Sequence, residues 1–317
     1  MTRKLLPSLL LPLALLLAAA GCKKEESTST KPSLAGLSIN SGTPTYVAVG
    51  DELSFSAVTQ NLYTSDDSTP GTIGLYWQVN SAKKDTLTKD IKGSNPPFTY
   101  RIDTLGVYSI LCYAYAGDAY YNASASVTTQ AIDPDTAVKG LAGIRPPGGQ
   151  VRIAQLSTLI WMAENYYGGT EGLCYLSSPV TAPALGKFYT WEQATHVCPS
   201  GWRLPTGADW DELGTEAGQL MADATFLDES LWSYEPSVKI TNQLGFNAIP
   251  AGYLDLTLKD APHTGFGEYA VFWTADSVNE NEAAYRYIYG ENPVIQKGKG
   301  DKTSLALSVR CVRDYIH

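Results

Sequence analysis

Hydrophobic and polar residues alternate between residues 34 and 132. Apolar side chains recur at every second position in three stretches, at 53–57, 75–79 and 108–114. This alternation is typical of β-strands with one buried face. Clusters of Gly, Pro, Ser, Asn and Asp separate the stretches and mark turns. About 100 residues of short strands and turns predict an all-β sandwich over residues 34–132.

Beyond residue 150, helical and strand patterns mix. Thr190 and Gln193 have the spacing of a capping box, which predicts a helix that ends near Cys198. Thr206 begins a second N-cap pattern, after which Trp210, Leu213 and Ala217 have the spacing of one buried helical stripe. Strands are expected around 270–275, 284–289 and 305–312. This mixture favours an α+β domain over residues 150–317.

Residues 133–149 separate the two regions. The segment contains Pro146-Pro147 and Gly148-Gly149, and such pairs interrupt regular structure. We therefore expect a linker between two domains.

The chain begins with a targeting pattern. An apolar run over 5–20 follows Arg3 and Lys4, and as a helix it would span only about 24 Å of a roughly 30 Å membrane core. Such a run is typical of a secretory signal peptide. It ends in Ala-Ala-Gly-Cys at 19–22, which resembles a bacterial lipobox except for Ala19 in place of Leu.

The lipobox resemblance implies that residues 1–21 are removed and that Cys22 is lipidated, which anchors the chain durably in a membrane. The alternative is a plain secretory signal with an incidental cysteine. Lys-Lys-Glu-Glu at 23–26 resembles a surface-export signal, although a solvated tether explains it equally well. We expect a flexible tether over 22–33 and an outer-membrane protein exposed at the cell surface.

Composition narrows the class of ligand. The chain has 23 Lys and Arg against 32 Asp and Glu, so its net charge of −9 disfavours nucleic acid. It has only three histidines, which argues against a histidine-based metal site or catalytic triad.

The first domain resembles an immunoglobulin-like or PKD-like domain. Trp77 has the position of a core tryptophan, and the segment 103–108 resembles the corner before the sixth strand. Cys112 has no cysteine partner in this domain and is expected to be a buried, inert thiol. Tyr113 and Tyr115 belong to an aromatic strip that either stacks on a glycan or packs within the sheet.

The second domain resembles the Fibrobacter succinogenes major paralogous domain. The resemblance covers about 165 residues and rests on blocks such as Cys-Pro-Ser-Gly-Trp-Arg-Leu-Pro-Thr at 198–206 and Ser-Val-Arg-Cys-Val-Arg-Asp at 308–314. The remaining blocks lie in order at 160–165, 189–194, 209–213, 245–248, 250–253 and 272–275.

The Arg-Leu-Pro-Thr segment is also similar to the formylglycine-generating-enzyme family. This resemblance implies a C-type-lectin-like α+β fold. It does not imply the activity, because that family uses two cysteines near its C-terminus and only Cys311 lies beyond residue 198 here. The calcium-dependent sugar motifs of C-type lectins are absent.

The family resemblance also implies a disulfide between Cys198 and Cys311. Cys174 matches the first member of a second pair whose partner is missing, so it is either free or bonded to Cys112. We expect it to be free.

Candidate chemistry is sparse. His196 and Cys198 could form a catalytic Cys–His pair, but the predicted disulfide would consume the thiol of Cys198. Carboxylates at 164, 209, 211 and 212 could serve glycoside hydrolysis, but acids in a first helical turn more often complement the helix dipole. Further candidate ligand-facing residues are Trp273 and three residues of the loop that follows it, namely Asp276, Asn279 and Glu280. A calcium site there is the alternative to a solvated loop, and no metal, cofactor or catalytic residue is expected.

These observations favour a non-enzymatic surface lipoprotein in which a sandwich presents a lectin-like head to a glycan or protein ligand. The alternatives are an enzyme acting on polysaccharide and a structural component of the envelope or of a pilus.

Overall fold

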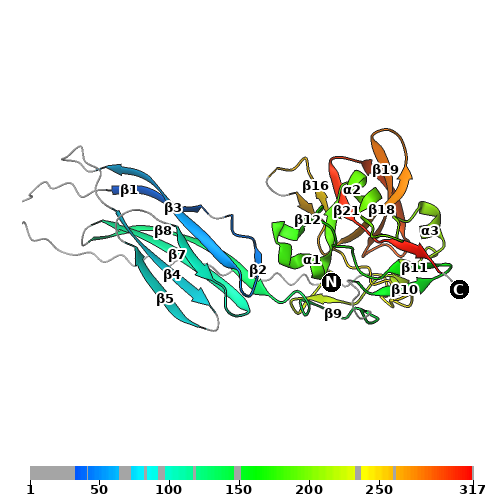
Figure 1. Cartoon of the computed structure of the whole chain (residues 1–317), viewed down its shortest axis with the longest axis horizontal. Coiled ribbons are helices and arrows are strands. Elements are labelled where there is room, and N and C mark those ends of the chain that lie inside the picture. Colours follow the sequence, from blue (N-terminus) through cyan, green and yellow to red (C-terminus); the bar gives the residue numbers. More distant parts are fainter. Residues whose placement is uncertain are drawn as a thin grey trace, which may run out of the picture.

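Two β-rich units follow one another in the computed structural model (Figure 1). The structure describes residues 33–40, 42–63, 73–81, 84–91, 97–116, 119–145, 151–232, 237–259 and 262–315. The predicted signal peptide, the lipidation site Cys22 and nearly all of the tether lie outside these residues. None of the helices in the described ranges is long and apolar enough to cross a membrane.

The first unit consists of two antiparallel-rich sheets with a common core. One sheet has the order β1-β3-β6 and the other the order β2-β8-β7-β4-β5. The strands are β1 (Ser33–Asn40), β2 (Tyr46–Ala48), β3 (Glu52–Tyr63), β4 (Ile73–Ser81), β5 (Lys84–Ile91), β6 (Phe98–Arg101), β7 (Gly106–Ala116) and β8 (Ala119–Ile132).

The alternating apolar positions of this unit point into the space between the two sheets. Trp77 is fully buried, and its ring stacks on Phe98 of the opposite sheet with centroids 5.1 Å apart. Tyr108 closes the predicted corner, since its hydroxyl donates to the carbonyl oxygen of Thr104 at 2.9 Å and accepts from the Thr104 amide at 3.1 Å. Cys112 is a free thiol whose pKa burial raises to about 12.

The second unit is organised around an eight-stranded sheet. Its main order is β12-β13-β21-β18-β19-β20, with β16 paired to β21 and β17 paired to β16. These strands are β12 (Leu173–Cys174), β13 (Lys187–Tyr189), β16 (Tyr253–Asp255), β17 (His263–Thr264), β18 (Tyr269–Ser277), β19 (Glu282–Tyr289), β20 (Gln296–Asp301) and β21 (Leu305–Ser308). A smaller sheet contains β10 (Ile153–Leu156), β11 (Leu159–Met162) and β22 (Val312–Asp314).

The predicted strands over 270–275 and 284–289 are confirmed. The predicted strand over 305–312 is divided, because β21 ends at Ser308 and Val312 pairs with Trp161 in the smaller sheet. The short helices are α1 (Ala182–Leu185), α2 (Trp191–Val197) and α3 (Gly207–Asp211).

Both predicted helix starts are confirmed, but the second helix is shorter than its pattern suggested. Thr190 and Thr206 each form a complete capping box. However, α3 ends at Asp211, and Gly214 has the left-handed φ of 83° that ends helices. Leu213 and Ala217 therefore lie beyond the helix. They are buried in the same cluster as Trp210 because the chain folds back over it.

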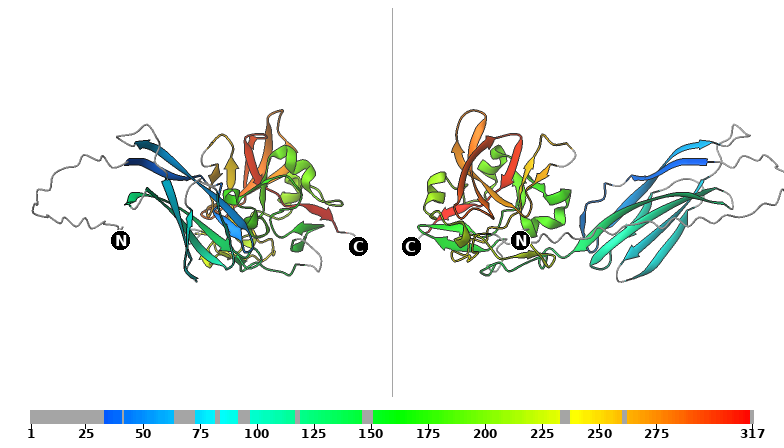
Figure 2. Two further views of the ribbon diagram at one scale, coloured as in Figure 1. Left: turned by 60° about the vertical axis from the view of Figure 1, so that its left-hand side comes forward. Right: turned by 180° about the vertical axis from the view of Figure 1, so that it is seen from behind.

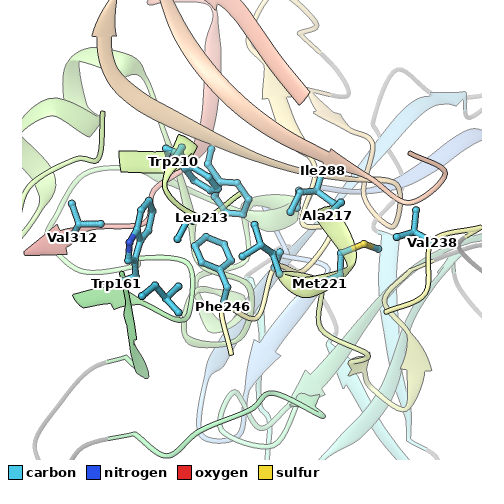
Figure 3. Close-up of a cluster of buried hydrophobic side chains, with 14 of the residues drawn as sticks. Trp161, Trp210, Leu213, Ala217, Met221, Val238, Phe246, Ile288 and Val312 are labelled. Carbon is cyan, nitrogen blue, oxygen red and sulfur yellow. The ribbon is translucent and has the colours of Figure 1, made fainter. Parts of the chain in front are cut away.

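The largest core cluster of the second unit is built on aromatic rings (Figure 3). Trp161 meets Trp210 edge to face at 5.1 Å and Phe246 at 5.6 Å. The residues come from segments far apart in the sequence. The blocks that carry the family resemblance thus meet in the interior of this unit.

Arg310 is a fully buried cation beside this cluster. Its guanidinium donates to the side-chain oxygen of Asn165 at 2.8 Å and to the carbonyl oxygens of Phe246 and Asn247 at 2.6 and 2.8 Å. A fourth acceptor is the carbonyl oxygen of Met162 at 3.2 Å. Burial lowers the pKa of Arg310, whereas these acceptors favour its charged form. The network fixes the asparagines of two family blocks as structural residues.

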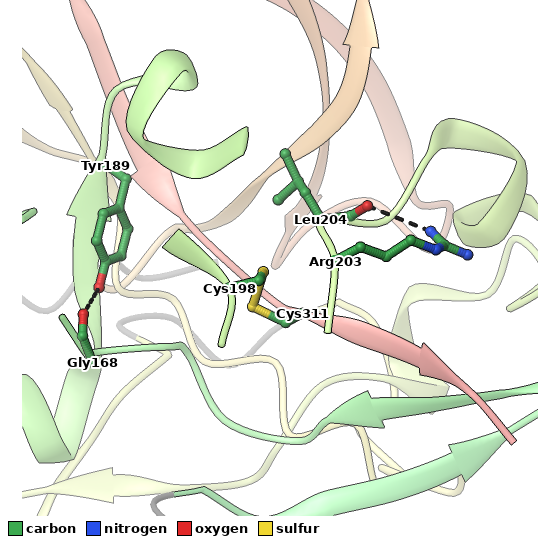
Figure 4. Close-up of a disulfide and its surroundings, with 6 residues drawn as sticks. All are labelled: Gly168, Tyr189, Cys198, Arg203, Leu204 and Cys311. Atoms are coloured by element: carbon green, nitrogen blue, oxygen red, sulfur yellow. Dashed lines mark hydrogen bonds between the residues drawn. A yellow bond between two sulfur atoms is a disulfide. The ribbon is translucent and has the colours of Figure 1, made fainter. Parts of the chain in front are cut away.

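The disulfide implied by the family resemblance is confirmed. Cys198 at the end of α2 is bonded to Cys311, just before β22, with Cα atoms 5.9 Å apart (Figure 4). Cys174 is a half-buried free thiol.

The segment predicted as a linker is partly a strand of the second unit. β9 (Val138–Lys139) pairs with β14 (Thr225–Phe226), which in turn pairs with β15 (Glu229–Ser230). Ala137, just before β9, is buried, and Asn247 accepts from the Ala142 amide at 2.8 Å. Short apolar side chains let this segment pack although its composition is typical of a loop.

The sandwich meets the second unit through one end (Figure 2). The Tyr46 amide donates to the Ser178 hydroxyl at 2.9 Å, and the Tyr46 ring lies edge to face with Phe226 at 5.6 Å. Ile132, the last residue of β8, is buried in the cluster that contains Phe226. Polar and apolar contacts therefore both hold the two units together.

Candidate ligand-binding groove

Trp273, a candidate ligand-facing residue, is buried and cannot face a ligand. It has no exposed surface, and its indole nitrogen donates to the carbonyl oxygen of Tyr189 at 2.8 Å. The ring of Tyr285 lies across it, with centroids 6.1 Å apart. The prediction that Trp273 faces a ligand is therefore wrong, because this residue lies beneath a second aromatic layer.

The oxygen-rich loop after Trp273 uses its polar groups within the protein. Asp276 accepts from the Gly207 amide at the start of α3 at 2.6 Å, and Asn279 accepts from the amide of Glu282 at 2.8 Å. The ammonium group of Lys302 donates to the carbonyl oxygens of Asn279 and Glu280 at 2.7 and 3.1 Å. These carbonyls thus hold a lysine. Within the described ranges, no group of three metal-ligating side chains comes together.

The aromatic strip of the sandwich is only partly described. Tyr113 is half-buried on the outer face of β7 and lies beside Tyr76, with centroids 5.9 Å apart. The side chain of Tyr115 lies outside the described part of the structure. A glycan-stacking role for this strip therefore stays a prediction.

The carboxylates considered for hydrolysis are mostly paired with cations. Glu164 is buried between Arg145, at 3.1 Å, and Arg152. Although burial tends to raise the pKa of Asp209, hydrogen bonds from Arg203 and Thr206 lower it. A hydrogen bond from Lys297 lowers the pKa of Asp211. Asp209 and Asp211 therefore favour the ionised form and are unsuited to act as general acids.

The histidine beside Cys198 has a different partner. Its imidazole lies 2.9 Å from the carboxylate of Glu171, and the thiol is consumed by the disulfide. A Cys–His catalytic pair is therefore not formed.

A groove of about 560 Å³ lies over one face of the eight-stranded sheet. Its described lining is dominated by tyrosines, with two acids and an aliphatic floor, and contains no basic residue. The lining residues are Tyr253, Asp255, Thr264, Glu268, Tyr269, Val271, Tyr285, Tyr287, Leu305 and Leu307.

The alternation of β18 and β19 places the tyrosines on one face. Tyr285, Tyr287 and Tyr289 occupy every second position of β19 and lie opposite Trp273, Val271 and Tyr269 of β18. The intervening residues, such as Phe272 and Ile288, enter the main core. The repeated tyrosines in the predicted strand over 284–289 are the sequence signal that was missed.

Two glycines allow tyrosine rings of the groove to lie directly against the backbone. A Cβ atom at Gly298 would lie 2.3 Å from the ring of Tyr285, and one at Gly265 would lie 2.6 Å from the ring of Tyr269. Only a residue without a side chain permits such close approach. The two rings therefore rest on bare backbone, which limits their movement before any ligand arrives.

The polar groups of the groove are available for binding. The hydroxyls of Tyr253, Tyr269, Tyr285 and Tyr287 have no hydrogen-bond partner among the described residues. Burial raises the pKa of Tyr285. Burial and the negative charge of Glu268 raise the pKa of Tyr269. The raised pKa values favour the neutral phenols of Tyr269 and Tyr285, and a phenol can both donate and accept hydrogen bonds.

Comparison with known proteins places the second unit in a family. No significant match was found among curated proteins. The solution structure of the PKD domain from the human VPS10 domain-containing receptor SorCS2 is a listed structural match with 15% sequence identity. That match covers 37% of this chain and 95% of the PKD-domain chain, with a TM-score of 0.25. The model of the Fibrobacter succinogenes major domain matches residues 154–313, half of the chain, and the protein belongs to this family.

Proposed function

We propose that this protein is a non-enzymatic surface lipoprotein that binds a glycan in the tyrosine groove. The observation that carries this proposal is the combination of four tyrosines, two carboxylates and an aliphatic floor in one groove. Its volume of about 560 Å³ is in the usual range for small-molecule sites.

The chemistry of the groove matches that of a sugar. A pyranose ring has an apolar face of C–H groups and an edge of hydroxyls. An aromatic ring covers the former, while phenols and carboxylates bond to the latter. The close contacts of Gly298 with the Tyr285 ring and of Gly265 with the Tyr269 ring reduce the conformational entropy that these side chains lose on binding.

We further propose how the groove is held at the cell surface. The second unit adopts a lectin-like variant of its family fold, and lipidation of Cys22 anchors the protein at the outer membrane, exposed at the cell surface. The sandwich then serves as a spacer. The ion-paired state of Glu164, Asp209 and Asp211 supports binding without hydrolysis.

A glycan array tests the ligand class. The full-length protein, purified in detergent micelles, is expected to bind one or more glycans equally well with calcium and with a chelator, because tyrosines and carboxylates form the groove without a metal. Absence of binding to all saccharides would contradict the proposal. Release of shortened products from a polysaccharide would show instead that the protein is an enzyme.

Replacing Tyr287 by Ala should weaken glycan binding about tenfold or more, because an aromatic contact of about 1.4 kcal/mol is lost. Tyr287 lies between Tyr285 and Tyr269, at 5.9 and 6.3 Å. Isothermal titration calorimetry measures the change. The matched control is Tyr113→Ala, which removes another half-buried tyrosine with a tyrosine neighbour. Equal affinities of the two variants would place the ligand elsewhere.

A further inference from the structure

The described lining of the groove contains two carboxylates and no basic residue. Several other carboxylates of the second unit have cationic partners, as Asp209 has Arg203 and Glu282 has Lys299. In the groove, Asp255 accepts only from the neutral amide and hydroxyl of Thr257, at 3.0 and 2.6 Å. Within the described residues, Glu268 has no side-chain partner.

The described lining of the groove supplies no cation to offset this charge. None of the described lining residues is basic. Burial raises the pKa of Tyr269, and the negative charges of Glu268 and Glu291 raise it further. Tyr289, stacked on Tyr269 at 4.8 Å, is hydrogen-bonded to Glu291 as well. The groove therefore combines electron-rich ring faces with negative charge that no described lining residue compensates.

This combination selects the charge of a ligand. Ring faces attract ammonium groups through their quadrupole, and a carboxylate adds Coulomb attraction that strengthens as water is excluded. The same groups repel uronic acids and sulfated sugars. An acetylated amine is neutral and gains neither attraction.

We propose that the groove binds amino sugars that carry a free ammonium group, with the cation held between Glu268, Asp255 and the tyrosine faces. This inference rests on the proposed glycan-binding function and specifies its ligand class. A lysine side chain presents the same ammonium group on a protein ligand, and the test distinguishes the two sources.

The test compares two oligomers that share a backbone and differ in charge, and adds an anionic oligomer of another sugar. Glucosamine hexamer, N-acetylglucosamine hexamer and an oligogalacturonate are titrated into the full-length protein at about pH 5.5, where amines are protonated and most carboxylates ionised. The glucosamine oligomer should bind at least about tenfold more tightly than the acetylated one, and the advantage should shrink in about 1 M salt. The oligogalacturonate should not bind.

Equal affinity for the glucosamine and N-acetylglucosamine oligomers, or preference for the anionic oligomer, overturns the charge inference while leaving glycan binding intact. Failure of every saccharide to bind removes the proposed function itself. Tighter binding of a lysine-rich peptide than of the glucosamine oligomer also overturns the inference, in favour of a protein ligand.

The isosteric variant Glu268→Gln identifies the charge responsible. It should remove most of the preference for glucosamine over N-acetylglucosamine and leave affinity for the neutral oligomer within about twofold, because only the charge changes. Glu280→Gln, in the exposed loop after β18, is the matched control and should keep the full preference. An unchanged preference in Glu268→Gln overturns the assignment of the cation to this groove.

Discussion

Replacing Arg310 by Met should lower the free energy of unfolding of the second unit by at least about 4 kcal/mol, or prevent its folding. Methionine fills much of the same space but donates no hydrogen bond. The carbonyl oxygens of Phe246 and Asn247 would lose their donor in the buried interior, as would the side-chain oxygen of Asn165. Urea denaturation, followed by tryptophan fluorescence, measures the loss.

Two further variants separate charge from geometry. Arg310→Lys keeps a cation but cannot reach all the acceptors of the guanidinium fork, so it should recover only part of the stability. Arg313→Met removes an exposed arginine that lies over Trp202 at 4.8 Å, and should cost less than about 1 kcal/mol. A similar small loss in Arg310→Met would show that the buried network contributes little.

Removing the disulfide should have the second largest effect. Cys198 and Cys311 are 113 residues apart, and closing a loop of this length stabilises a fold by about 4–5 kcal/mol in the chain-entropy model. The double variant Cys198→Ala/Cys311→Ala should therefore unfold at much lower urea concentration, and reductant should have the same effect on the natural protein.

The control for this experiment is Cys174→Ala, which removes a half-buried thiol outside the bridge. It should leave the urea midpoint and its response to reductant unchanged. If reductant does not destabilise the natural protein, the native packing already restricts these ends and the loop-closure estimate fails.

Local patterns predicted the sandwich well because each of its strands has one buried face. The side chains of Leu53, Phe55 and Ala57 point inward as their alternation requires. The helix starts were equally predictable, since a capping box involves only neighbouring residues. The disulfide followed from the family resemblance, because spacing alone does not determine which cysteines pair.

Features that depend on distant contacts were not predictable. The pattern Trp210, Leu213 and Ala217 suits one helix, yet α3 ends at Asp211. Leu213 and Ala217 lie beyond the helix and are buried in the cluster that contains Trp210, Trp161 and Phe246. The β9 strand exists because β14 offers it an edge some ninety residues later.

The groove was missed for a related reason. Alternating tyrosines in β19 could equally be core residues. They line a groove because the paired strands β16 and β21 form its other side. Trp273 was the more conspicuous candidate because of its size, but the ring of Tyr285 lies across it and its side chain has no exposed surface.

The joint between the two units has a consequence for many copies acting together. Because Tyr46, Ile132 and β9 fasten the sandwich to the second unit, the groove is held at a set height and tilt relative to the start of the sandwich. If neighbouring copies are anchored in one membrane as proposed, their grooves would lie within the reach of the expected flexible tether from the membrane. A polymer with repeating units could then engage several copies at once, and avidity would convert modest single-site affinity into firm attachment.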